Sequence, residues 1–171
     1  MTNELQLHQI SVSEMDNNCY LLQAGEEGLL VDAADDAPAL LDMAQKAGVK
    51  ITAVLTTHRH WDHVRALKEV LSETGAIHYA SFLDSPAIPA EVDVELREGD
   101  SIKFAGLDLP IIILRGHTPG GAALASATYF WRIMDGLVAA EHGADQGGEA
   151  HVGDPLGVGA GISVGVMVTR L

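Results

Sequence analysis

Three histidines and one aspartate lie close together in residues 57–63, which read Thr-His-Arg-His-Trp-Asp-His. Imidazole nitrogens and carboxylate oxygens are common protein ligands of zinc. His58 and His60 are two positions apart, so a near-extended backbone points both side chains the same way, toward one cation. Asp62 and His63 follow where the chain turns into a helix, and they could bind a second cation nearby. Because clustered imidazoles are costly to remove from water, packing explains them poorly, and the stretch predicts a site for two adjacent metal ions.

An apolar run precedes this cluster, and an amphipathic run follows it. Residues 51–55 predict a buried strand, which places the histidines at its carboxyl end. After the cluster, apolar residues recur at helical spacing until a glycine stops the helix: Val64, Leu67, Val70, Leu71 and Gly75. The cluster is therefore expected on a strand-loop-helix unit.

The residues before this unit predict three short strands and one helix. The strands, expected to form an antiparallel meander, are residues 5–12, 18–23 and 28–32. Asp36 is placed to cap a helix that has Pro38 in its first turn and ends at Gly48. The carboxylate of Asp32 has two interpretations: it supports the metal-binding loop without binding the ion itself, or it caps the turn that follows. Cys19, the single cysteine, is expected to be a buried strand thiol.

Further strands are predicted downstream, and a second motif follows the last of them. The expected strands are residues 76–81, 94–96, 101–105 and 107–114, with a loop at 85–90. His78 lies in the first of these strands and is expected to be structural. Residues 116–120, Gly-His-Thr-Pro-Gly, come directly after the last strand, and their glycines let the backbone pass close to a bound ion.

The two motifs together resemble a known family. Residues 57–63 are similar to the T-H-x-H-x-D-H signature of the metallo-β-lactamase superfamily, especially its glyoxalase II-like thioester hydrolases, and residues 116–120 resemble its G-H-T-P-G loop. The resemblance implies an α/β fold, a sandwich of two mixed sheets flanked by helices, with ligands from both sheets at one edge. It also implies that His117 joins His58 and His60 on the first ion, while Asp62 and His63 hold the second.

The sequence departs from the family pattern after about residue 124. The family's apolar-Gly-Asp step supplies a bridging aspartate, for which Asp154 is the candidate; a Gly-Asp-Pro turn is the alternative. No histidine follows His151, so the family's last ligand has no counterpart after Asp154. His142 and His151 are expected to be loop residues, with substitution of either one as a ligand as the alternative. We expect one domain over residues 1–171 with an abbreviated second half, in which residues 1–125 match the family and residues 126–171 form a divergent tail, disordered or incomplete.

Composition restricts the partners. The formal net charge of −14 offers no basic surface to phosphates, so nucleic acid is not an expected partner. The uncharged, glycine-rich residues 155–169 are too short to span a bilayer, and no membrane partner is expected. The N-terminal residues show no secretory signal, which favours the cytoplasm. The oligomeric state is left open.

The resemblance implies a metal-dependent hydrolase with a small-molecule substrate. The expected cofactor is Zn²⁺, two ions in a complete site, with iron as the alternative metal. Two adjacent cations would acidify a shared water and polarise the carbonyl of a hydroxyacylglutathione-like thioester or related ester. Asp62 is assigned a catalytic role besides its role as a ligand. Two alternatives stay open: an iron-dependent persulfide dioxygenase, and an incomplete, inactive relative that binds one metal or none.

Overall fold

The computed structural model describes residues 5–125, and its larger sheet has six strands. The first three strands pair antiparallel, which confirms the predicted meander, whereas the third to sixth pair in parallel. This sheet is therefore mixed. Its strands follow one another in chain order: β1 (Leu5–Val12), β2 (Asn17–Ala24), β3 (Glu27–Val31), β4 (Lys50–Thr56), β5 (Ile77–Ser81) and β6 (Val94–Leu96).

A smaller sheet follows the larger one in the chain. In the described residues it has three strands, β7 (Ser101–Phe104), β8 (Leu107–Leu114) and β9 (Gly121–Leu124). Both pairings are antiparallel. The turn between β7 and β8 is short because Ala105 and Gly106 adopt positive φ angles of 49° and 78°. The loop between β8 and β9 carries the Gly-His-Thr-Pro-Gly motif.

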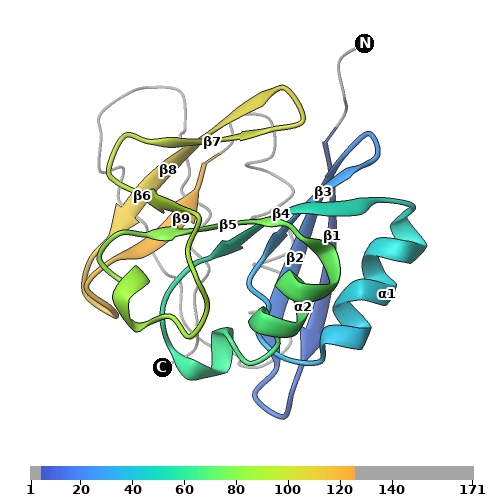
Figure 1. Ribbon diagram of the computed structural model, residues 1–171, viewed down its shortest axis with the longest axis horizontal. Coiled ribbons are helices and arrows are strands. Elements are labelled where there is room, and N and C mark those ends of the chain that lie inside the picture. Colours follow the sequence, from blue (N-terminus) through green and yellow to red (C-terminus); the bar gives the residue numbers. More distant parts are fainter. Residues whose placement is uncertain (1–4, 126–171) are drawn as a thin grey trace, which may run out of the picture.

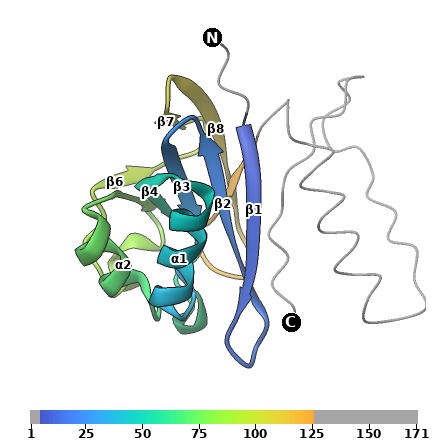
Figure 2. The ribbon, with the colours of Figure 1, turned by 90° about the vertical axis from the view of Figure 1, so that its right-hand side faces the viewer.

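The larger sheet is covered on both faces (Figures 1 and 2). Helices α1 (Ala37–Ala47) and α2 (Leu67–Thr74) lie on one face, and the smaller sheet packs against the other. Successive residues of β3 show this division, because side chains alternate between the faces of a strand. Leu30 packs with the helices, whereas Leu29 packs with Ile102 and Phe104 of β7. The described residues thus form a helix-sheet-sheet sandwich of the α/β class.

Helix α1 begins and ends at recognisable signals. The Asp36 side chain accepts a hydrogen bond from the Ala39 backbone N–H at 3.1 Å, and Gly48 ends α1 at a φ of 71°, as predicted. Helix α2 begins at Leu67, later than the apolar spacing suggested. Val64 instead lies between α2 and the short 3₁₀ helix η1 (Trp61–His63), where it is buried beneath the helices.

Two buried side chains agree with their expected structural roles. His78 Nδ1 lies 2.6 Å from the Glu91 carbonyl oxygen, and its Nε2 lies 2.8 Å from the Thr56 hydroxyl oxygen. Cys19 is fully buried in β2, and burial raises the pKa of its thiol to about 12. In residues 5–125 neither helix has the length and apolar character needed to cross a bilayer.

Candidate metal centre

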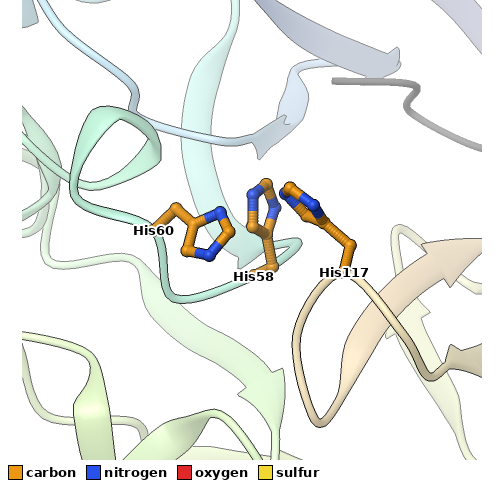
Figure 3. A group of neighbouring side chains, drawn as sticks. All are labelled: His58, His60 and His117. Carbon is orange, nitrogen blue, oxygen red and sulfur yellow. The ribbon is translucent and has the colours of Figure 1, made fainter. Parts of the chain in front are cut away.

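Three of the predicted ligands converge where the two sheets meet (Figure 3). His58 and His60 lie in the loop after β4, and His117 lies in the loop between β8 and β9. Each ring offers one nitrogen, and these nitrogens lie within 4.8 Å of one another. The ring centroids are 4.9 Å apart for His58 and His60, 4.9 Å for His58 and His117, and 4.4 Å for His60 and His117. Each sheet therefore contributes to one group of three imidazoles.

The hydrogen bonds of His58 leave one of its nitrogens available for a cation. The Thr57 hydroxyl donates its proton to Asp32 Oδ2 at 2.7 Å. The Thr57 oxygen can then accept from His58 Nδ1, 3.0 Å away, which assigns the ring proton to Nδ1. His58 Nε2 is buried and has no hydrogen-bond partner. A buried nitrogen with a free lone pair, facing two other imidazoles, fits a zinc-type cation.

Burial also keeps His58 in the form that binds metal. Removal of the ring from water, followed by the neighbouring His63, lowers the pKa of His58 to about 4. The ring is therefore neutral at pH 7. A cation binding at Nε2 does not have to displace a proton from this histidine.

His63 and Asp62 are placed beside this group by η1. Nδ1 of His63 lies 2.7 Å from Asp32 Oδ2, and its Nε2 lies 3.6 Å from Asp62 Oδ2. Burial works against a charge on His63, but the hydrogen bond and negative charge of Asp32 raise its pKa overall. Partial burial also opposes the charge of Asp62, whereas a hydrogen bond from Asn17 helps to lower the pKa of that carboxyl group.

Asp32 supports both groups of candidate ligands. Its side chain is fully buried, and it accepts from the Thr57 backbone N–H, the Thr57 hydroxyl and His63 Nδ1, all at 2.7 Å. Asp32, His58 and His63 also bring ligand atoms within 4.8 Å of one another. Because the Asp32 oxygens already accept from three donors, we interpret this carboxylate as holding the histidines in place and not as capping the turn.

Two residues that the sequence analysis did not assign to the site connect its parts. Asp84 is buried after β5; its Oδ2 accepts from the Arg59 backbone N–H at 3.1 Å and its Oδ1 from the Gly120 N–H at 3.0 Å. It therefore links the two histidine loops. Asn17, at the start of β2, donates a hydrogen bond from Nδ2 to Asp62 Oδ2 at 3.0 Å. Neither residue belongs to a local motif.

The structure thus brings together five predicted site residues, His58, His60, Asp62, His63 and His117. Their role as ligands stays a prediction, as does the catalytic role of Asp62. Asp154, the candidate bridging ligand, lies outside the described residues, as do His142 and His151.

Comparison with known families agrees with this arrangement. Residues 12–127 match the sequence model of the Metallo-beta-lactamase superfamily, and this is more than half of the chain. The chain therefore belongs to the metallo-beta-lactamase superfamily.

Among curated proteins, the chain is similar to hydroxyacylglutathione hydrolases. It is 36% identical over 110 residues to the one from Fuscovulum blasticum, covering 63% of this chain and 42% of that protein. It is 34% identical over 114 residues to the one from Pseudomonas entomophila, covering 66% of this chain and 43% of that protein. The chain spans less than half the length of these relatives.

Solved structures share the fold. The B3 metallo-beta-lactamase BLEG-1 superposes with a TM-score of 0.67 at 20% identity, over 72% of this chain and 68% of that one. TTHA1623, solved in a di-iron-bound form, gives a TM-score of 0.59 at 28% identity, over 68% of this chain and 65% of that one. The first likeness supports the fold alone.

Replacing the supporting carboxylate should weaken metal binding. Asp32→Asn keeps the size of the side chain but turns one acceptor into a donor that faces His63 or Thr57. We expect the affinity for metal to fall by about 10- to 100-fold, and the free energy of unfolding to fall by about 1–3 kcal/mol. Chelator competition and urea unfolding measure the two effects. Asp35→Asn is the control, because the ion pair of this half-exposed carboxylate with Arg65 lies near the surface, and its loss should change both values little. Unchanged affinity in Asp32→Asn would contradict the supporting role.

A side chain at Gly120 should displace the loop that carries His117. A Cβ there would lie 2.4 Å from Ser81 Oγ and 2.5 Å from Leu83 Cβ, so Gly120→Ala must shift the loop. We expect weaker zinc affinity and a lower Tm. Gly99→Ala is the control: its φ of 86° makes alanine strained, but nothing lies within 4 Å of the new Cβ. It should lower Tm and leave zinc affinity unchanged; equal affinities in both variants would show that the loop position does not matter.

Proposed function

We propose that this protein is a metal-dependent hydrolase of thioesters or related esters. The observation that carries the proposal is the buried, unpartnered Nε2 of His58 within the group formed with His60 and His117. Unpaired buried polar atoms are rare in folded proteins, and this one faces two further imidazoles. The similarity to hydroxyacylglutathione hydrolases supports a small thioester as the substrate.

In this proposal the residues have separate tasks. His58, His60 and His117 would hold one ion, and Asp62 and His63 would hold the second, with Asp154 as the proposed bridge. Bound ions of this kind acidify a coordinated water at neutral pH and polarise a carbonyl group. Asp32 fixes His63, and through Thr57 it fixes His58, in both cases at Nδ1, which leaves Nε2 as the remaining nitrogen of each ring. The Asp62 side chain is 17% exposed, so solvent reaches the carboxylate to which we assign the catalytic role.

Zinc is the proposed metal, because the donor set is rich in imidazole. Iron is the second candidate, since imidazole also suits iron. TTHA1623, at 28% identity, was solved with two iron ions. Elemental analysis of the purified protein separates the two metals.

The test is hydrolysis of a hydroxyacylglutathione thioester by the purified full chain. We expect a chelator to remove activity, added zinc to restore it, and His58→Ala to reduce it to the uncatalysed rate, because the first ion would lose one of three imidazoles. His8→Ala is the control, since His8 lies on β1 beside Gln23 and outside the histidine group.

Two results would contradict the proposal in different ways. Metal binding without hydrolysis would favour an inactive metal-binding relative. Hydrolysis that persists in His58→Ala and in the presence of chelator would exclude this centre as its source.

A further inference from the structure

The Asn17 side chain contacts the two atoms that are predicted to bind the second ion, Asp62 Oδ2 and His63 Nε2. Its side-chain Nδ2 donates to Asp62 Oδ2 at 3.0 Å and lies 3.3 Å from His63 Nε2. An ionised carboxylate only accepts hydrogen bonds, so the contact with Asp62 assigns the amide nitrogen to the side that faces the site. The Ser13 hydroxyl then donates to Asn17 Oδ1 at 3.1 Å. The residue is 8% exposed, so water competes little with these contacts.

The atoms that Asn17 contacts are those that a cation would need. A metal ion binds the neutral form of an imidazole. In that form of His63 the proton lies on Nδ1, which faces Asp32, so the lone pair lies on Nε2, toward the amide. Asp62 offers Oδ2 to the same amide nitrogen. An amide nitrogen donates hydrogen bonds and has no lone pair to give to a metal. A second ion therefore has to displace these contacts before it can bind.

The first group differs from the second in this respect. His58 Nε2 has no hydrogen-bond partner, whereas Asp62 Oδ2 and His63 Nε2 are both contacted by the Asn17 amide. The geometry points to Asn17 as a positioning residue that competes with the second ion, so that the two sites fill in order, the histidine group first. This inference rests on the two-ion centre of the proposed function.

Substitutions at position 17 should change the affinity for the second ion and leave the affinity for the first ion unchanged. Asn17→Ala removes the competing donor, and we expect the second ion to bind about tenfold tighter. Asn17→Asp places a carboxylate beside Asp62, which should tighten the second ion further by adding an acceptor and by repulsion between the empty carboxylates. Asn18→Asp is the matched control: it adds the same charge one residue along, where the Asn18 side chain accepts from Gln9 on an exposed surface.

The measurement is a zinc titration of the apo full chain against a chromophoric chelator, with circular dichroism as a check of folding. Tighter second-ion binding in Asn17→Ala, with the first affinity and the Asn18→Asp control unchanged, supports the inference. Equal or weaker second-ion binding in Asn17→Ala overturns it. If that variant does not fold, Asn17→Asp decides: a second ion bound no tighter than in Asn18→Asp overturns the inference.

The affinity for the first zinc ion, measured in the same titration, tests the proposed function. If wild type and all variants bind no zinc, the two-ion centre is wrong, and the order of filling is wrong with it. If the wild type binds one ion, we expect Asn17→Asp to bind two. If both proteins bind one ion, the inference is overturned, whereas the site formed by the three histidines stands.

Discussion

The buried carboxylate of Asp32 is the constraint on which the centre depends. A charge removed from water is tolerated only when hydrogen bonds replace the lost hydration. Here three donors do so: the backbone and hydroxyl of Thr57, and the ring of His63. These bonds also fix the geometry: the Thr57 bonds hold the chain at the end of β4, and Nδ1 of His63 contacts Asp32 directly. Nδ1 of His58 contacts Asp32 through the Thr57 hydroxyl, so Nε2 is the remaining nitrogen of each ring. One acidic side chain thus orders both groups of candidate ligands.

The centre also depends on the contact between the two sheets. The Ala122 N–H donates to the Thr57 carbonyl at 2.7 Å, which joins β9 to the end of β4 beside the histidines. Asp84 adds a second connection, from the Arg59 backbone to Gly120. Neither connection would align without the apolar layer between the sheets, where Leu29 of β3 packs with Phe104 of β7. The packing of the sandwich therefore sets the distances among the imidazoles.

Local patterns in the sequence predicted the strands, helix α1 and the neighbourhood of the histidines, because alternation and caps act over a few residues. Helix α2 was placed too early, since Val64 has helical spacing but is buried within a turn. The roles of Asn17 and Asp84 could not be predicted, because each acts on a partner 25 to 45 residues away that only the folded sheets bring near. For Asp32 the sequence left two interpretations open, since its donors, Thr57 and His63, lie 25 and 31 residues away along the chain.

His58 and His117 lie in loops that follow strands of different sheets, and this has a consequence for chain entropy. An ion held by both would act as a cross-link that closes a loop of about 60 residues. In the loop-closure description, such a link removes disorder from the unfolded chain equivalent to about 4 kcal/mol, as a disulfide over the same span would. The chain has one cysteine and cannot form that disulfide. Metal occupancy and the free energy of unfolding would then be linked quantities, and each would report on the other.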